Sequence, residues 1–165
     1  MRKVDFKQLE LNPFTVLGEE AFLLTAGDAE NWNTMAAAWG GFGFAWDMPT
    51  VYVFVRESRH TYEYIENQDK FSMSFFPPDL RSVIEYCGSC SGREVDKIAG
   101  TGLTPVLVDG TVAFEEANLV ITCEKIVSAK VQQEDINKPE IFDKHYKNGD
   151  LHHMYCGVVT GIYVQ

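Results

Sequence analysis

The stretch Thr50-Val-Tyr-Val-Phe-Val-Arg56 gives the clearest indication of the fold. The residues between its ends are β-branched or aromatic throughout, and these residue types are enriched in strands. Pro49 introduces the stretch and charged residues follow it. We therefore expect a buried strand that begins at Thr50 and ends at Arg56.

Other segments of the chain indicate further strands and a few short helices. The predicted strands are Ala21–Ala26, Thr34–Trp39, Phe71–Phe76, Thr111–Phe114, Asn118–Lys130 and Tyr155–Val164. The predicted helices are Thr61–Asn67, Leu80–Tyr86 and Glu94–Ala99. Before the second helix, Pro77 and Pro78 end a strand and Asp79 is expected to cap the helix. Many strands without regular strand–helix alternation favour an antiparallel barrel over a parallel, doubly wound sheet.

The composition limits the classes of protein to consider. With 165 residues and 45% hydrophobic content, we expect one domain with a substantial core, spanning residues 1–165. The chain has 14 Lys and Arg against 24 Asp and Glu, a formal net charge of −10, which argues against nucleic-acid or anionic membrane partners. A small anionic ligand stays possible, because it responds to local charge. Four of the five arginines lie between Arg56 and Arg93.

The N-terminal segment, the lack of a long apolar run and the cysteines lead us to expect a cytoplasmic protein. The segment Met1–Glu10 lacks the apolar centre of a signal peptide, and no apolar run approaches the roughly 18 residues of a membrane span. Four cysteines are too few for a disulfide scaffold in a chain of this size, so we expect free thiols.

Three motifs are set aside on spacing. Gly40–Phe44 lacks the dinucleotide fingerprint, since Trp46 stands where the third glycine is needed, and we expect a glycine-rich turn there. Cys87 and Cys90 have the spacing of a zinc or redox pair, but neither a second ligand pair nor a βαβ pattern accompanies them. A nucleophile elbow with Cys90 as the nucleophile is also disfavoured, because such an elbow follows a strand whereas the residues before Cys87 and Cys90 are predicted to be helical. We therefore assign no catalytic residue and no metal ligand.

Three stretches suit a planar, phosphorylated ligand: Asn31–Gly40, Val55–Thr61 and Ser89–Lys97. In Asn31–Gly40, alanines let a flat ring approach the backbone, Asn33 and Thr34 offer hydrogen-bonding groups, and Trp39 can form a wall. A tightly packed core strand explains the alanines equally well. In Val55–Thr61, arginines before a short helix can bind phosphate oxygens, although a solvated charged turn is the simpler interpretation.

The third stretch and a pair of histidines are less specific. The loop Ser89–Lys97 leads from serines and a glycine into a helix that carries positive charge. His152 and His153 are adjacent, so on a strand they point to opposite faces and do not form a metal pair. One of them facing a ligand and both being ordinary histidines are equally acceptable interpretations.

Taken in order, these stretches are similar to the flavin reductase-like FMN-binding split barrels. The similarity runs from about residue 20 to the C-terminus, and its later motifs resemble the flavoredoxin subgroup. The matching motifs are Asn33-Thr-Met-Ala-Ala-Ala-Trp-Gly-Gly, Pro49-x-x-x-x-Phe54-Val-Arg56-x-x-Arg59-x-Thr61-Tyr62, Phe71-x-x-Ser74-Phe75-Phe76, Cys87-Gly-x-x-Ser91-Gly-Arg93-x-x-Asp96-Lys97 and His152-x-Met154-Tyr155-x-Gly157.

The resemblance implies a mainly β, FMN-binding split β-barrel with a few short helices, generally a homodimer with FMN near the subunit interface. It implies that the isoalloxazine is lined by Asn33, Thr34, Met35, Ala36, Ala37, Ala38 and Trp39. It further implies that Arg56, Arg59, Thr61 and Lys97 serve the ribityl phosphate and that His152 lies near the flavin. The family's usual small hydroxyl residue in the first motif is replaced here by alanine, so a backbone group would have to supply that contact.

The expected function is an FMN-dependent oxidoreductase that takes electrons from NAD(P)H or a protein donor and passes them to an acceptor. The flavin would carry the chemistry, which agrees with the lack of a catalytic triad. The alternative is an electron-transfer protein of flavoredoxin type without NAD(P)H reductase activity. A metal or thiol module at Cys87 and Cys90 is a weaker third interpretation.

Overall fold

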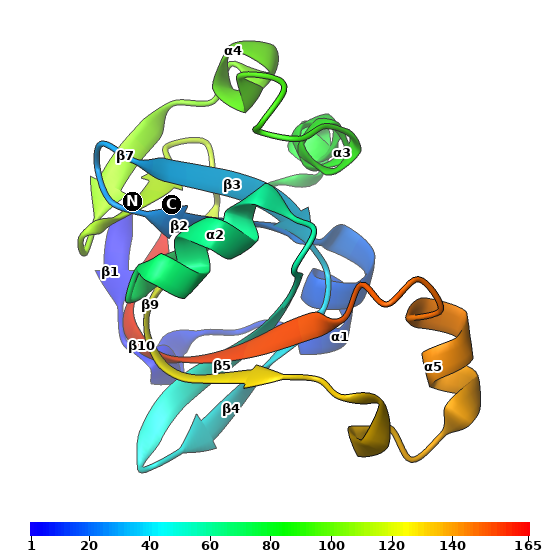
Figure 1. Cartoon of the computed structure of the whole chain (residues 1–165). Coiled ribbons are helices and arrows are strands. Elements are labelled where there is room, and N and C mark those ends of the chain that lie inside the picture. Colours follow the sequence, from blue (N-terminus) through cyan, green and yellow to red (C-terminus); the bar gives the residue numbers. More distant parts are fainter.

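The computed structural model describes residues 1–165, and the chain is mainly β, as the sequence predicted (Figure 1). Eight strands form one antiparallel sheet: β1 (Arg2–Val4), β2 (Phe22–Gly27), β3 (Trp32–Ala37), β4 (Gly40–Ala45), β5 (Met48–Arg56), β6 (Lys70–Phe75), β9 (Leu119–Lys130) and β10 (His152–Val164). Their order is β3-β2-β6-β9-β10-β5-β4, with β1 paired to β10. The sheet curls into a barrel. Its end strands β3 and β4 do not pair with each other, so the barrel is split along this seam.

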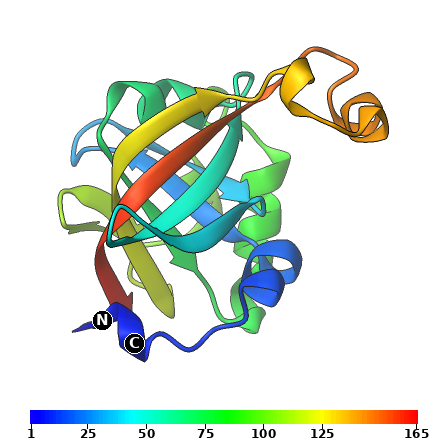
Figure 2. The ribbon, with the colours of Figure 1, turned by 90° about the horizontal axis from the view of Figure 1, so that it is seen from below.

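Short helices and one hairpin surround the barrel. The hairpin consists of β7 (Pro105–Val108) and β8 (Thr111–Phe114). The α-helices are α1 (Pro13–Thr15), α2 (His60–Asn67), α3 (Arg81–Ser89), α4 (Lys97–Thr101) and α5 (Pro139–His145). Further helical turns of 3-10 or π geometry lie at Phe6–Gln8, Val16–Glu20, Pro78–Leu80 and Gln133–Asp135. None of the helices is long and apolar enough to cross a membrane. Residues 131–151, the excursion between β9 and β10 that carries α5, project away from the barrel (Figure 2).

Two apolar cores lie on the two faces of the sheet. Strand β2 contributes to both, because Phe22 and Leu24 point into the barrel while Leu23 points outward under α3. The barrel core also contains Val53 and Tyr155, among other fully buried side chains. Because each face of β2 packs against one of the two cores, β2 is buried at every position. Strand β3 pairs with β2 along one edge.

The glycine-rich segment is a strand and not the turn that the sequence suggested. Gly40–Ala45 forms β4, which pairs with β5. A Cβ at Gly40 would lie 2.3 Å from the carbonyl oxygen of Tyr52, so close approach of the two strands requires glycine there. The turn lies at Trp46 and Asp47, both with positive φ, as in a two-residue hairpin.

Two helix starts also differ from the prediction. Asp79 belongs to a 3-10 turn, and no side chain caps α3, whose N-cap is Leu80. The third predicted helix begins at Lys97, three residues later than expected, because Asp96 accepts hydrogen bonds from the first free amides of α4. Strands β1 and β7 and helix α5 had no predicted counterpart.

Candidate functional site

Two adjoining hollows lie beside β3, one towards α3 and the start of α2 and the other towards the end of β5 and the start of β10. The polar hollow is lined by Asn33, Met35, Ala36, Ser58, Arg59, His60, Thr61, Cys87, Gly88, Cys90, Ser91, Gly92 and Lys97. The apolar hollow is lined by Met35, Ala36, Ala37, Ala38, Trp39, Phe54, Arg56, Arg59 and His152. They share Met35, Ala36 and Arg59 and therefore form one cleft.

The start of α2 faces the polar hollow without an internal partner. Arg59 is the N-cap residue, and no side chain of the chain caps this helix. The first amides of a helix lack partners within the helix, so here they are left for solvent or a ligand. The guanidinium of Arg59 also has no ion-pair or hydrogen-bond partner, although it lines both hollows. An anion placed here meets a free positive charge and free N–H groups.

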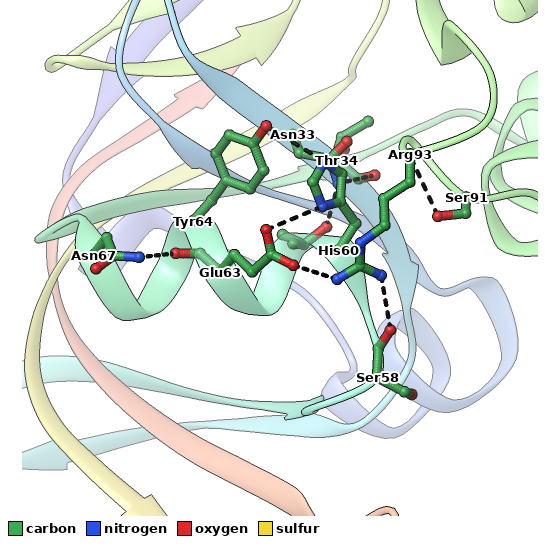
Figure 3. A network of polar contacts seen from close by, with 10 residues as sticks. Asn33, Thr34, Ser58, His60, Glu63, Tyr64, Asn67, Ser91 and Arg93 are labelled. Carbon is green, nitrogen blue, oxygen red and sulfur yellow. Dashed lines mark hydrogen bonds and ion pairs between the residues drawn. The ribbon is translucent and has the colours of Figure 1, made fainter.

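A polar network holds the walls of this hollow in place (Figure 3). Glu63 on α2 lies between His60, at 3.5 Å, and Arg93, with which it forms an ion pair. Arg93 also donates a hydrogen bond to the carbonyl oxygen of Ser58, at 3.1 Å. The network therefore ties the loop after α3 to the start of α2, and Arg93 pairs with protein groups instead of facing the hollow.

Asn33 and Gly92 meet at the back of the polar hollow. The side-chain amide of Asn33 donates a hydrogen bond to the hydroxyl of Thr61 at 2.7 Å. A Cβ at Gly92 would lie 2.1 Å from Oδ1 of Asn33, so only glycine allows the loop to approach this closely. Gly92, which belongs to the Ser89–Lys97 stretch, thus lets this loop form the back wall of the polar hollow.

Lys97 lies in the wall with its ammonium group already bonded. Nζ donates hydrogen bonds to the carbonyl oxygens of Thr34 and Cys87, each at 2.9 Å. Burial lowers the pKa of Lys97. The side chain thereby joins β3 to α3, and one N–H of the ammonium is left for the hollow.

Arg56 is bonded to the excursion and does not reach the polar hollow. Its guanidinium donates to the carbonyl oxygens of Asp150, at 2.5 Å, and His145, at 3.1 Å, and lies 3.8 Å from the Asp150 carboxylate. Asp150 in turn accepts hydrogen bonds from the hydroxyl and the backbone N–H of Ser58. Arg56 therefore fastens the excursion beside the apolar hollow.

His152 forms one side of the apolar hollow and is nearly buried. Its ring lies 4.7 Å from the ring of Trp39, measured between centroids, and its Nδ1 is 2.9 Å from the hydroxyl of Tyr146. Burial, with a smaller contribution from the positive charge of Arg56, lowers the pKa of His152 to about 4. The imidazole is therefore neutral near pH 7.

This lowered pKa predicts how stability depends on pH. In the unfolded chain His152 titrates near the ordinary pKa of about 6.5, so between about pH 4 and 6.5 the unfolded state binds a proton that the folded state does not. The contribution of His152 to the free energy of unfolding is therefore at its full value above about pH 6.5 and is lost as the pH falls towards 4. Urea denaturation should show a smaller fall in unfolding free energy between pH 7 and 5 for His152→Gln than for the wild type. Equal falls would contradict the neutral, buried imidazole.

Cys87 and Cys90 line the polar hollow, and neither has the surroundings of a reactive thiol. All four are free thiols. Cys87 belongs to the outer core and Cys123 to the barrel core, so they lie on opposite faces of the sheet. Burial raises the pKa of Cys87 to about 11, which keeps it a thiol, and Sγ of Cys90 donates a hydrogen bond to the carbonyl oxygen of Tyr86 at 3.2 Å.

The structure brings together all but one of the residues selected from the sequence. The exception is Thr34, which lines neither hollow and whose buried hydroxyl bonds to Thr25 and to the carbonyl oxygen of Leu24. The sequence reasoning missed Phe54, hidden within a strand pattern, and Tyr146, which lies behind His152 in an excursion without any recognised motif. Cys87 and Cys90 were noted as a pair but not as wall residues.

The charge of the cleft is opposite to that of the chain. Neither hollow is lined by an aspartate or glutamate, although the chain carries a net charge of −10. The cleft offers a free guanidinium and uncapped amides at one end and small or aromatic apolar side chains at the other. Such a donor set fits an elongated ligand with an anionic group at one end and a flat ring at the other.

Comparisons with known proteins agree with this description. The profile described as flavin reductase like domain matches residues 17–164. The structure of flavoredoxin of Desulfovibrio vulgaris (Miyazaki F) is 24% identical with a TM-score of 0.68, covering 88% of this chain and 69% of that one. An FMN-binding protein from Thermus thermophilus, solved with 1-cyclohex-2-enone, is 22% identical with a TM-score of 0.70, covering 99% and 80%.

A third solved structure, flavin reductase PheA2, is 17% identical with a TM-score of 0.64, covering 88% of this chain and 79% of that one. No curated protein gives a significant match. At these identities the structural likenesses establish a shared fold.

Proposed function

The chain belongs to the flavin reductase-like domain family, and from this premise we propose that it binds FMN in the cleft beside β3. We propose further that it is a single-domain, cytoplasmic oxidoreductase that passes electrons from NAD(P)H or a protein donor through FMN to an acceptor. The observation that carries the proposal is a cleft without any carboxylate in its lining, with an unpaired Arg59 beside an uncapped helix start.

Different residues along the cleft bind different parts of the ligand. Arg59 and the amides at the start of α2 hold the phosphate, and the Asn33–Thr61 pair together with Gly92 shapes that end. The small side chains of residues 36–38 admit the flat ring against the backbone, where main-chain groups replace the missing side-chain hydroxyl. Thr34 contributes its carbonyl to Lys97 and no side-chain contact.

The same residues prepare the site for electron transfer. FMN, when bound, supplies the hydride- and electron-accepting chemistry of the isoalloxazine. Trp39 and Phe54 exclude water from the ring end, and the positive charge of Arg59, which also lines the apolar hollow, favours a ligand that gains negative charge. His152 stays neutral there and moves no proton of its own near pH 7.

A second candidate function is electron transfer without NAD(P)H reductase activity. It is favoured by the likeness to the Desulfovibrio vulgaris flavoredoxin. Anaerobic mixing of the FMN-loaded protein with NADH or NADPH distinguishes the two, because a reductase loses the absorbance of oxidised flavin within the time of a turnover. Retained absorbance with both nucleotides, and reduction by a protein donor or dithionite alone, would favour the carrier.

We also propose that two copies of the chain associate through the face beside the apolar hollow. Phe14, which lines a neighbouring hollow together with Trp39 and Phe54, is 86% exposed, and Phe44 (64%) and Trp46 (60%) are exposed farther along the β4–β5 hairpin. Trp39, which lines the hollow, is 42% exposed. Exposed apolar groups of this number mark an interaction surface. Light scattering at micromolar concentration should give the mass of a dimer, and a monomer that retains FMN would contradict the proposal.

The thiols have no part in the proposed mechanism, which yields a prediction for Cys90. Cys90→Ser should leave FMN affinity and the rate of flavin reduction within about twofold of the wild type, because serine keeps the donor that bonds to Tyr86. Fluorescence titration and stopped-flow absorbance provide the two readouts. Loss of reduction in a folded, FMN-loaded variant would instead support a thiol relay.

A further inference from the structure

Tyr146 is buried against the barrel even though the excursion that carries it projects into solvent (Figure 1). Its hydroxyl lies 2.9 Å from Nδ1 of His152, and the guanidinium of Arg56 lies over its ring, 5.4 Å from the centroid. Burial raises the pKa of Tyr146, so the hydroxyl keeps its proton near neutral pH. The contact is therefore a hydrogen bond between a neutral phenol and an imidazole.

The direction of this hydrogen bond follows from the partners on each side. The Tyr146 hydroxyl has no acceptor other than Nδ1 of His152. If Nδ1 carried the proton and donated it, the hydroxyl proton of Tyr146 would be buried without a partner, which costs free energy. The phenol therefore donates to Nδ1, and the single proton of the neutral imidazole resides on Nε2.

The other ring nitrogen faces the cleft. Nε2 of His152 bonds to no group of the chain, and unlike a buried atom without a partner it is accessible from outside the protein. His152 lines the apolar hollow between Trp39 and Phe54, with their ring centroids 4.7 and 6.2 Å from its own. An N–H group on Nε2 is thus presented to that hollow with its orientation fixed from behind.

We propose that Tyr146 is a positioning residue, whose hydroxyl holds His152 in the Nε2–H form so that it donates a hydrogen bond to an acceptor atom of the ligand. The acceptor is a carbonyl oxygen or an unprotonated ring nitrogen at the edge of a planar heteroaromatic ring. The identity of that ring as a flavin rests on the proposed function, whereas the tautomer does not. Specificity at this edge of the ring comes from a fixed donor instead of a titrating acid.

The tautomer can be measured without any ligand. Long-range ¹H–¹⁵N correlation spectra of the ligand-free protein at pH 7, assigned with His152→Gln, report which ring nitrogen is protonated. We expect a protonated Nε2 and an unprotonated, hydrogen-bonded Nδ1. A protonated Nδ1 on His152 would overturn the inference.

Two variants then connect the tautomer to ligand binding. Tyr146→Phe keeps the ring and removes only the hydroxyl, and should shift the Nδ1 resonance and weaken FMN binding by about 2- to 10-fold, the effect of one neutral hydrogen bond. The matched control is Tyr163→Phe, because Tyr163 lies near the other end of the same strand, β10, where Nζ of Lys3 is 5.3 Å from its ring centroid, outside the two hollows. It should change neither readout.

The outcomes separate this inference from the proposed function. An unchanged Nδ1 resonance in Tyr146→Phe, or an unchanged FMN affinity despite a shifted resonance, would contradict the positioning role. Failure of the wild-type protein to bind FMN at all would contradict the proposed function, while the ligand-free spectra would still decide the tautomer.

Discussion

Replacing Arg59 with alanine is expected to weaken FMN binding by about 10-fold to 100-fold while leaving riboflavin binding unchanged. A hydrogen bond to a charged group contributes about 1.5–3 kcal/mol, and Arg59 is the cation of the cleft that has no protein partner to compete for it. Because Arg59 caps α2 only through its backbone, the helix start should persist without the side chain. Fluorescence titration with both flavins measures the effect.

The control for this variant is Arg81→Ala. Arg81 lies on α3 and pairs with Glu85 on an exposed surface, so its removal changes the net charge equally without touching either hollow. FMN affinity should stay within about twofold of the wild type, since surface pairs contribute little. Equal losses in both variants would mean that FMN responds to overall charge, and an Arg59→Ala protein with normal affinity would return Arg59 to the solvated-turn interpretation.

Replacing Arg56 with alanine is expected to destabilise the fold by about 2 kcal/mol or more, in addition to any change in flavin affinity. The substitution removes hydrogen bonds to two carbonyl oxygens of the excursion and the contact with the Tyr146 ring. Urea denaturation measures the free energy, and limited proteolysis should show faster cleavage within residues 131–151. The family resemblance had assigned Arg56 to the phosphate, and this variant tests that assignment directly.

The contrary result is equally clear. An Arg56→Ala protein that loses FMN affinity with unchanged stability and unchanged proteolysis would restore the phosphate role. Lys130→Ala is a suitable comparison, because Lys130 pairs with Glu57 at the same end of the barrel but holds no part of the excursion. It should leave the proteolysis of residues 131–151 unchanged.

The strands that carry the site were predictable from the sequence because each is buried on at least one face. Thr50–Arg56 consists of residues that favour strands, and its end at Arg56 coincides with the end of β5. Strand β4 was missed because glycines are typical of turns. Glycine is needed in this strand because the backbone approaches Tyr52 closely, which is a tertiary contact that the sequence pattern does not show. Helix α5 was missed because it has only seven residues and none of them is buried.

The site residues were predictable as a set but not in their individual roles. Sequence motifs place two arginines beside a helix start, yet only the fold shows that Arg56 is bound to Asp150 while Arg59 is free. Thr34 and Asn33 are adjacent, and the alternation of a strand sends one hydroxyl into the sheet and one amide to the cleft. The pairing of Tyr146 with His152 depends on how the excursion folds back, which no local pattern encodes.

The central claim, that this cleft binds FMN through its phosphate and its ring, is tested most directly by titrating the purified protein with FMN and with riboflavin. FMN has about 31 non-hydrogen atoms, and at ~0.3 kcal/mol per atom the binding free energy is roughly 9 kcal/mol, a dissociation constant on the order of sub-micromolar. We expect that affinity for FMN and at least tenfold weaker binding of riboflavin, which lacks the phosphate. No binding of FMN below about 100 μM, or riboflavin bound as tightly as FMN, would contradict the account.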